Sequence, residues 1–418
     1  MNMLPASRRR VILSGLIGNT TEWYDFSLYG YFATVIGRQF FPADNPQTSL
    51  LAAFGAFAAG FLARPLGGVA FGRIGDRLGR KRALMLSILL MAVPTFLIGC
   101  LPTFETIGFA APVLIVALRM AQGLSAGGEY TSSVAFLVEQ APENGRAFNA
   151  VWAPWGSVFG IMLGSATGFL LSSALTDSQI DAWGWRLPFL GSVLIAGVGY
   201  LLRNGLHAGQ AAGGSDQPFR DAIGRYRGVV AKVALLNVAV GVGTYSTLVY
   251  SVSYMEKIDQ IGSRAAFGLN TAAMGFVLLI TPLAARLSDR IGRKPLIIVG
   301  CALFAAGAIP FLELIHGPPL SLIFLRKLGY VTALGLLFAG ATACMAEMIP
   351  TAVRCTGLAL AYNISLACFG GATPLIATWL YVETGNPIAP AWWIAGGGAV
   401  GLFTALFLIP ETRFWPLP

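Results

Sequence analysis

Charged side chains inside long apolar segments are the part of this sequence that could do chemistry. Glu22 and Asp25 lie three residues apart in one such segment, and Arg119 lies at a similar depth in another. An ionisable group is costly inside a bilayer, so each of the three is a candidate functional residue. A buried carboxylate near a guanidinium changes its affinity for protons when the guanidinium moves. The pattern therefore predicts a site that binds and releases charge.

Four further ionisable residues lie inside apolar segments. Glu129 follows Arg119 by about two and a half helical turns, and Arg64 lies in another segment. We interpret Arg64 as one partner of a structural ion pair. Arg326 and Lys327 are adjacent, so their side chains cannot face the same point of a helix surface, and we expect Arg326 to face the interior.

The elements that must position these residues follow from the composition. The chain has 418 residues, of which 56% are hydrophobic and 11% charged, and its mean hydropathy is +0.69. Soluble domains carry about 25% charged residues, so the composition excludes an ordinary soluble fold and a disordered chain. A membrane-spanning helix needs about 20 mainly apolar residues. We count twelve such segments, at 11–37, 49–74, 82–101, 108–138, 146–173, 185–204, 228–256, 265–288, 293–312, 318–347, 353–383 and 389–411.

The charges between these segments predict the topology. Basic residues gather in alternate loops, which the positive-inside rule assigns to the cytoplasm together with both termini. Arg8, Arg9 and Arg10 precede the first segment as they would in a signal peptide, but no small-residue cleavage site follows, so we expect a retained helix. Topology accounts for the net charge of +9, and we expect no nucleic-acid partner.

The two halves of the chain repeat. The matching stretches are GRIGDRLGRKRAL (72–84) with ARLSDRIGRKPL (285–296) at an offset of 213, VEQAPENGRA (138–147) with AEMIPTAVRC (346–355) at 208, and Arg119 with Arg326 at 207. Repeats of this kind place a substrate site between the halves, near the membrane midplane. We expect an N-terminal six-helix bundle at 1–204, a cytoplasmic linker at 205–227 and a C-terminal six-helix bundle at 228–418.

Local strings resemble those of one transporter family. The GxxxDRxGRK loop, present in both halves, resembles the major facilitator superfamily, although Ala285 replaces the first Gly in the second copy. The strings that are similar to its metabolite:proton symporter branch are GNTTEWYDFSLYGY (18–31), FLARPLGG (61–68), LRMAQGLSAGGEY (118–130) and WGWRLPF (183–189). That branch includes α-ketoglutarate, citrate, shikimate and proline/betaine carriers. The resemblance implies an all-α membrane protein with twelve transmembrane helices in two pseudo-symmetric six-helix bundles.

The resemblance also implies roles for particular residues, because helices 1, 4, 7 and 10 surround a central cavity in this family. Proton coupling is assigned to Glu22, Asp25 and Glu129. Substrate binding is assigned to Arg119, Arg326, Tyr245, Tyr250, Tyr31 and Gln122. Gating is assigned to Asp76, Arg77, Arg80, Glu139, Asp289, Arg290, Arg293 and Glu347. We expect protonation of Glu22 or Asp25 to release Arg119 for the substrate.

Two guanidiniums, one from each half, favour a cargo with two or more carboxylates, because Arg binds carboxylates bidentately. We therefore expect proton-coupled import of a di- or tricarboxylate such as citrate or α-ketoglutarate, by alternating access, across a bacterial inner membrane. One cation with an aromatic box would instead indicate a zwitterionic osmolyte such as proline or betaine. Another monocarboxylate and drug/proton antiport are further alternatives.

Other classes of function lack their residues. The two His lie in different loops and none of the five Cys forms a CxxC pair, so we expect no metal site and no disulfide. No GxxxxGK[ST] motif is present, which argues against an ATP-driven pump. We expect no enzymatic activity and no cofactor, and the twin repeats favour a carrier over a channel. The expected partners are an organic anion, a proton and membrane lipid, with the chain acting as a monomer.

Overall fold

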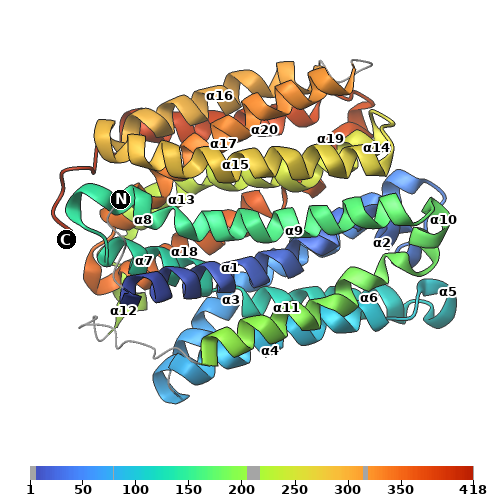
Figure 1. Ribbon diagram of the computed structural model, residues 1–418, viewed down its shortest axis with the longest axis horizontal. Coiled ribbons are helices and arrows are strands. Elements are labelled where there is room, and N and C mark those ends of the chain that lie inside the picture. The colour runs from blue at the N-terminus through green and yellow to red at the C-terminus, as the bar shows by residue number, and fades with distance from the viewer. Residues whose placement is uncertain (1–5, 79, 205–216, 314–318, 418) are drawn as a thin grey trace.

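The computed structural model describes the backbone of residues 6–78, 80–204, 217–313 and 319–417, and the side chains of residues 16–68, 70, 86–87, 89–197, 217–312 and 319–417. The described chain is helical throughout and forms no strand. Helices of the first half, blue to green, occupy mainly the lower part of Figure 1.

The first half contains α1 (Ala6–Tyr31), α2 (Ala33–Phe40), α3 (Pro46–Leu78), α4 (Arg80–Cys100), α5 (Phe104–Ile107), α6 (Ala110–Ser125), α7 (Glu129–Glu139), η1 (Glu143–Gly145), α8 (Arg146–Ala150), α9 (Trp152–Ala174), α10 (Asp177–Gln179), η2 (Ile180–Gly184) and α11 (Arg186–Asn204). The second half contains α12 (Pro218–Ile223), α13 (Arg227–Thr244), η3 (Tyr245–Tyr250), α14 (Ser251–Lys257), α15 (Ser263–Ile291), α16 (Arg293–Glu313), α17 (Leu320–Met348), η4 (Thr351–Val353), α18 (Arg354–Ser365), η5 (Leu366–Gly370), α19 (Thr373–Thr384), α20 (Pro390–Phe403) and η6 (Thr404–Leu408). In Figure 1, α15, α16, α17 and α20 of the second half lie above the helices of the first half, while α12 and α18 lie at the lower left.

Within the described ranges these helices form twelve membrane-crossing segments, six in each half, as the apolar pattern predicts. The segments of the first half are α1, α3, α4, α6 with α7, α8 with α9, and α11. Those of the second half are α13 with η3 and α14, α15, α16, α17, α18 with η5 and α19, and α20 with η6. By length and apolar composition alone, nine helical stretches qualify as membrane-spanning among the residues searched, and Leu89–Cys100 and Arg186–Gly197 are shorter apolar helices.

The boundaries differ from the predicted ones in several places. The first predicted helix is divided at Phe32 into α1 and α2. The stretch expected to be a loop contains α12 at Pro218–Ile223, the part of it that lies within the described residues. Pro218 at the first position and Gly224 directly after the last are the residues that start and stop a helix, so this short helix has a local sequence cause.

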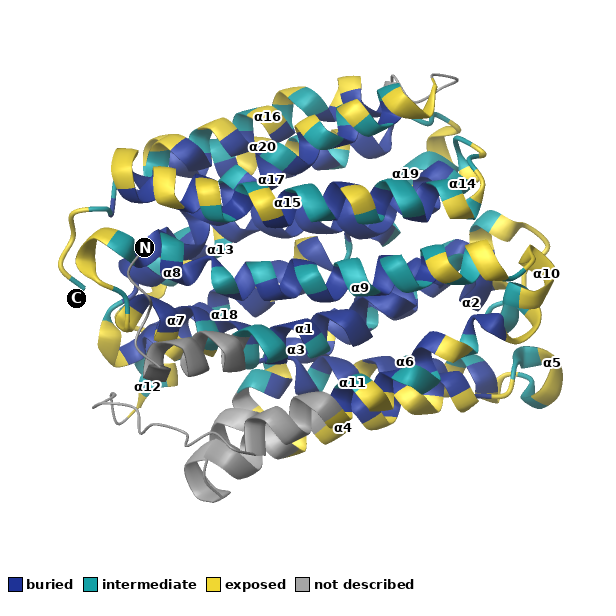
Figure 2. Cartoon of the chain, in the orientation of Figure 1, coloured by how far each residue is buried: buried dark blue, intermediate teal, exposed yellow. Residues whose placement is uncertain are grey.

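The chain has two ends along the helix direction. The terminal end holds both chain termini, at the left of Figure 1, and the distal end holds the opposite loops, including those after α2 and α14. The halves meet mainly where α15 packs on α9 and α3 packs on α19. Buried residues run through the middle of the view in Figure 2, while exposed residues concentrate on the outer helices.

Large apolar side chains on the outer helices are exposed, which suits contact with lipid. Leu194 in α11, Leu279 in α15 and Phe407 in η6 are each more than 70% exposed. In water such side chains would be costly, whereas a bilayer solvates them. The outward-facing surface therefore agrees with a protein that crosses a membrane.

Glycines set the spacing between α3 and α6. A methyl group on Gly123 would collide with the carbonyl oxygen of Gly60, and one on Gly60 would lie 2.9 Å from the carbonyl oxygen of Arg119. Small residues allow the backbones of membrane helices to approach closely. The side chain of Arg119 is thus held against α3 by a helix contact that depends on these glycines.

Replacing Gly123 by Ala should lower the free energy of unfolding by about 1–3 kcal/mol, because α6 must move away from α3. Thermal unfolding of the purified protein in detergent measures this. Gly55→Ala is the control, since Gly55 lies in the facing helix α3 and a methyl group there has open space. The control should change the unfolding free energy by no more than about 1 kcal/mol. Equal effects of the two substitutions would contradict the packing argument.

Candidate functional site

A buried ion pair lies where the two halves meet. Nη2 of Arg64, from α3, is 3.0 Å from Oε1 of Glu22, from α1. Both side chains are at most 5% exposed. Arg64 also donates to the carbonyl oxygen of Ala126 at 2.8 Å and, through Nε, to Oδ1 of Asn363 at 3.3 Å. Asn363 belongs to α18, so the guanidinium binds both halves at once.

A break between α6 and α7 supplies part of this contact. The chain leaves helical geometry at Ala126–Gly128, and the carbonyl oxygens of Ala126 and Gly127 accept hydrogen bonds from Arg64 and Asn363. A continuous helix would have used these carbonyls within its own backbone. The Gly-rich string in this segment therefore allows two backbone acceptors to serve the ion pair.

Aromatic rings from both halves surround the pair. The indole of Trp23 lies 6.1 Å from the ring of Tyr245 and 6.4 Å from the ring of Tyr130. Tyr130 in turn stacks on Tyr362 at 4.5 Å, and the guanidinium carbon of Arg64 lies 5.6 Å from the Trp23 ring. We call this cluster the central site; it consists of Glu22, Trp23, Arg64, Tyr130, Tyr245 and Tyr362.

Three hydrogen-bond donors in the central site have no acceptor within the part of the chain that the structure describes. They are Nε1 of Trp23, Nη1 of Arg64 and Oη of Tyr245, all buried and without a hydrogen-bond partner among the described residues. A buried polar group that lacks a partner costs about 1–3 kcal/mol. Donors from α1, α3 and η3 in one cluster can satisfy a ligand that brings acceptor oxygens, such as a carboxylate.

Arg119 lies deeper in the first half, where its guanidinium packs against three aromatic rings. Its guanidinium carbon is 4.3 Å from the ring centre of Phe26, 4.6 Å from Tyr29 and 5.1 Å from Phe57. Nη1 of Arg119 donates to Oε1 of Gln122 at 2.7 Å. The rings attract the cation through their quadrupoles, and they keep it in place without a carboxylate.

The expected pairing of Glu22 or Asp25 with Arg119 is wrong for this conformation. Among the described side chains, no carboxylate oxygen lies within 4.0 Å of the Arg119 guanidinium, and Glu22 pairs with Arg64 instead. Asp25 is fully buried beside Thr95. Neither of its carboxylate oxygens accepts a hydrogen bond from the described residues. Release of Arg119 by protonation of Glu22 therefore has no basis in the observed contacts.

Gln122 connects these groups. It accepts from Arg119 and donates through Nε2 to Oγ1 of Thr95 at 2.7 Å. Thr95, in α4, adjoins Asp25. A polar chain thus runs from Arg119 to Asp25 inside the first half.

Tyr31 and Tyr250 lie toward the distal end and not in the central site. The hydroxyl of Tyr31 donates to the carbonyl oxygen of Leu248 at 2.7 Å and accepts from Nδ2 of Asn270 at 3.1 Å. The ring of Tyr250 packs 6.3 Å from Phe54. These contacts join the halves at the distal end. Glu129, the third predicted proton-coupling acid, is the partly exposed first residue of α7, and its role stays a prediction.

In α17 the buried cation is Lys327, and the expectation that Arg326 faces the interior is incorrect. Lys327 is 1% exposed, and its Nζ donates to Oγ of Ser251 at 2.6 Å and to the carbonyl oxygen of Thr247 at 3.2 Å. Arg326 is partly exposed. The offset of 208 that relates Glu139 to Glu347 also relates Arg119 to Lys327, so a consistent offset would have selected the buried residue.

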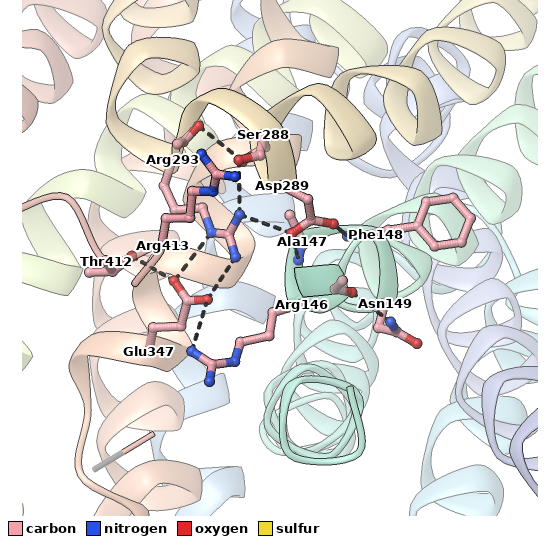
Figure 3. A network of polar contacts seen from close by, with 12 residues as sticks. Arg146, Ala147, Phe148, Asn149, Ser288, Asp289, Arg293, Glu347, Thr412 and Arg413 are labelled. Carbon is pink, nitrogen blue, oxygen red and sulfur yellow. Dashed lines mark hydrogen bonds and ion pairs between the residues drawn. The ribbon is translucent and has the colours of Figure 1, made fainter. Parts of the chain in front are cut away.

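Charged residues form a second contact between the halves at the terminal end (Figure 3). Both carboxylate oxygens of Asp289, at the end of α15, accept backbone N–H groups at the start of α8, from Ala147 and Phe148, each at 3.0 Å. A carboxylate at a helix N-terminus is stabilised by the free N–H groups and the helix dipole. Asp289 therefore holds the second half against the first.

Arg293 and Glu347 support that contact from within the second half. Arg293 donates to Asp289 at 2.9 Å and pairs with Oε1 of Glu347 at 3.0 Å. Nη1 of Arg146, from the first half, lies 3.8 Å from the same oxygen. We call Arg146, Asp289, Arg293 and Glu347 the terminal network. Its members alternate in charge, so each buried charge has an opposite neighbour.

The segment after the last helix completes the terminal network. Oγ1 of Thr412 donates to Glu347, and the carbonyl oxygen of Trp415 accepts from Arg146 at 2.7 Å. Glu411 accepts the backbone N–H groups of Arg293 and Lys294, at 2.9 and 3.0 Å, and so caps α16. The sequence interpretation missed these residues, although an acid two residues from the end of an apolar run was a visible signal.

Three of the predicted gating residues, Asp76, Arg77 and Arg80, lie outside the residues whose side chains the structure describes. Glu139 is another predicted gating residue. In the described chain it accepts from Nη1 of Arg354 at 2.8 Å, which is another contact between the halves. Arg290 is exposed on the surface of α15. The gating roles stay predictions.

Replacing Asp289 by Ala should loosen the terminal end, because it removes the cap of α8 and a partner of Arg293. A helix cap contributes about 1–2 kcal/mol, so opening should become about 5- to 30-fold more frequent. Maleimide labelling of a cysteine placed at Phe148, in a background without the native cysteines, measures the opening rate.

Asp181→Ala is the control for this experiment, because Asp181 pairs with Arg38 on the exposed surface of the first half. It should leave labelling at position 148 unchanged. A labelling rate that does not rise in Asp289→Ala would show that the terminal network does not restrain the two halves.

Comparison with known proteins identifies the family of this chain. Residues 11–206 match the family described as "Sugar (and other) transporter", and residues 233–417 match "Major Facilitator Superfamily". The chain is 34% identical to the glycine betaine/proline/ectoine/pipecolic acid transporter OusA of Dickeya dadantii, over 98% of this chain and 84% of that protein. It is also 34% identical to the proline/betaine transporter of Escherichia coli K12, over 98% of this chain and 85% of that protein.

Solved structures show the same fold. The xylose transporter XylE from E. coli, in a partially occluded inward open conformation, superposes with a TM-score of 0.77 at 18% identity, covering 99% of this chain and 100% of that chain. A crystal structure of a D-xylose-proton symporter gives a TM-score of 0.76 at 19% identity, covering 97% and 98%. The chain belongs to the major facilitator superfamily and is a multi-pass membrane transporter.

The predicted di- or tricarboxylate cargo is wrong. The relatives that match over nearly the whole chain are named for proline and betaine, each of which carries one cation and one carboxylate. The prediction depended on two guanidiniums facing one cavity. The structure instead places one guanidinium, that of Arg64, beside one carboxylate in the central site.

Proposed function

We propose that this transporter imports a zwitterionic osmolyte, such as proline or glycine betaine, together with protons, by alternating access. The observation that carries the proposal is the central site, where a buried carboxylate and a buried guanidinium lie among four aromatic rings drawn from both halves. The names of the relatives that match over nearly the whole chain support the same class of cargo.

The cationic group of the cargo has a fitting environment. The rings of Trp23, Tyr130 and Tyr245 lie close to one another, and Tyr245 interacts electrostatically with the Glu22 carboxylate. Ring faces attract ammonium groups, and quaternary ammonium compounds are recognised by aromatic cages of this kind. A trimethylammonium group cannot donate hydrogen bonds, so rings suit it better than carbonyl oxygens do.

The carboxylate of the cargo has donors that the protein leaves unsatisfied. Nη1 of Arg64, Nε1 of Trp23 and Oη of Tyr245 are buried without acceptors in the described chain. A carboxylate can accept from all three, and the bond to a guanidinium is charge-assisted and therefore stronger than a neutral hydrogen bond. The same cluster therefore offers opposite poles for opposite ends of a zwitterion.

Cargo binding would compete with the ion pair between Glu22 and Arg64. Breaking a buried pair is costly because it leaves two uncompensated charges. A zwitterion supplies a new partner for each of them, so the charges stay balanced, whereas a dianion would not balance Glu22. The pair thereby selects against cargoes with two carboxylates.

Proton coupling is assigned to acids inside the membrane-crossing segments. Glu22, Asp25 and Glu129 are the candidates, and Asp25 is the fully buried one whose charge no ion pair balances within the described residues. Binding of a proton would neutralise Asp25. A buried group that binds and releases a proton is what coupling to a proton gradient requires.

Orientation and assembly complete the proposal. The basic loops place both termini in the cytoplasm, so the terminal network closes the cytoplasmic side and the contacts of Tyr31 close the outside. The bacterial relatives suggest an inner membrane. We propose that the protein works as a monomer, because the two halves of a single chain together supply all residues of the central site.

The test is uptake by purified protein in proteoliposomes with an acidic exterior. Labelled glycine betaine or proline should accumulate above its external concentration and should be lost when a protonophore collapses the gradient. Excess unlabelled betaine should compete, while citrate and α-ketoglutarate should not. Accumulation of a dicarboxylate without uptake of either zwitterion would contradict the proposal.

Tyr245→Phe removes a single hydroxyl from the central site and should weaken cargo binding by about 3- to 10-fold, the effect of one lost hydrogen bond. Tyr330→Phe is the matched control, because Tyr330 is also buried with no partner for its hydroxyl in the described chain but packs against Phe304 and Phe311 within the second half. Calorimetric titration with betaine compares them. If both variants lose affinity equally, the hydroxyl of Tyr245 is not a ligand.

A further inference from the structure

The second half contains a small cavity that the central site does not use. It has room for about one water molecule. Segments that line it are η3 with α14, the end of α16, the start of α17, and α20. The central site, by contrast, draws its residues from both halves.

The cavity contains a buried amine. Lys327 is 1% exposed, and Nζ donates to Ser251 and to the carbonyl oxygen of Thr247. Among the described residues, no carboxylate oxygen lies within 4.0 Å of Nζ. An ammonium has three donors, so two protein partners leave one N–H for the cavity. A charge buried without an opposite charge is costly, so this amine is a group at which a proton can bind or leave.

The titratable neighbours of Lys327 lead toward the distal face. The cavity is lined by Tyr250 and Tyr254 from η3 and α14, whose rings lie 5.9 Å apart, and by the apolar Phe311, Leu312 and Ile394 from α16 and α20. Asp259, in the distal loop after α14, interacts electrostatically with both tyrosines. Partial burial raises the pKa of the Asp259 carboxyl to about 7, so it exchanges protons near neutral pH.

The amine also touches the segment that carries the central site. Thr247 and Ser251 lie in and directly after η3, a stretch of wider π-helix that holds Tyr245 at its first position. In a π-helix the usual backbone pattern is disturbed, and such segments occur frequently at functional sites. A change of charge on Lys327 therefore acts on the segment that holds Tyr245.

The two halves carry one such cation each. At the offset of 208, Lys327 corresponds to Arg119, which is likewise fully buried and lacks a carboxylate partner in the described chain. A guanidinium does not release its proton in proteins, whereas a buried amine can. The repeat thus places a permanent cation in the first half and an exchangeable one in the second.

We propose that Lys327 binds a proton during the transport cycle, and that the proton reaches it from the distal face through Asp259, Tyr254 and the cavity. No covalent step is involved: a proton moves from the distal solution to Nζ and leaves when the terminal end opens. The inference rests on the proposed proton-coupled transport and adds to it a group in the second half.

Lys327→Met tests this, because Met keeps the length of the side chain and cannot take a proton. Two assays are compared in proteoliposomes: accumulation of labelled betaine driven by an acidic exterior, and exchange of labelled for unlabelled betaine at equal pH. Accumulation should be lost, while exchange should stay within about 3-fold of the unsubstituted protein, since exchange needs no net proton movement. Leu325→Met is the control, because Leu325 lies on the same helix and is 64% exposed.

Direct proton uptake separates coupling from packing. Adding betaine to the unsubstituted protein in weakly buffered detergent solution should change the pH reported by an indicator dye, and Lys327→Met should lose that change. Asp259→Asn should slow proton-driven uptake and remove the dependence of its initial rate on external pH around 7, because an amide neither titrates nor passes on a proton. Below that pH the unsubstituted carboxyl is mainly protonated and above it mainly charged.

Accumulation by Lys327→Met with the pH profile of the unsubstituted protein would overturn the proposal. If Lys327→Met cannot be recovered folded, Lys327→Arg decides: lost accumulation with retained exchange supports the proposal, and retained accumulation overturns it. Loss of exchange in both variants overturns it in favour of a packing role. Failure of the unsubstituted protein to take up betaine or proline would contradict the proposed function itself, which the Lys327 variants do not address.

Discussion

A charge inside this protein cannot be stabilised by bulk water, so it must be balanced by another protein group, and that constraint organises the interior. This constraint has its largest structural effect at the ion pair between Glu22 and Arg64. Arg64 also binds Ala126 and Asn363, so it connects three helices and both halves. Leaving either charge alone would be costly. The contact between the halves therefore depends on a pair that a zwitterion of opposite polarity can replace.

The same constraint is met differently at the terminal end. Asp289 satisfies backbone N–H groups of α8 as well as the side chain of Arg293, and Glu347 is shared by Arg293, Arg146 and Thr412. The first half adds Arg146 and the N–H groups of α8 to ion pairs that lie within the second half. At the distal end Tyr31 and Asn270 make neutral hydrogen bonds between the halves instead. The charged contact and the neutral contact close opposite ends of the same structure.

Pseudo-symmetry has preserved the position of a buried cation but not its surroundings. Arg119 lies on the rings of Phe26, Tyr29 and Phe57, whereas Lys327 lies against a hydroxyl and a backbone carbonyl beside a small cavity. A guanidinium is weakly hydrated and spreads its charge over a plane, so rings suit it, while a compact ammonium needs oxygen partners. The chemistry of each cation thus explains which kind of group surrounds it.

The sequence by itself determined the twelve membrane-crossing segments, the repeat and the family, because long apolar runs, matching motifs and scarce charges are local properties of the chain. It also identified Glu22, Asp25, Arg64 and Arg119 among the buried charges, since burial of an ionisable residue is rare enough to be informative. Only the tertiary structure decided the partners: Arg64 and not Arg119 for Glu22, Lys327 and not Arg326 inside α17, and Thr412 beside Glu347. Which face of a helix turns inward, and which charge meets which, depends on the rotation and packing of helices that are far apart in the chain, and no local pattern records those.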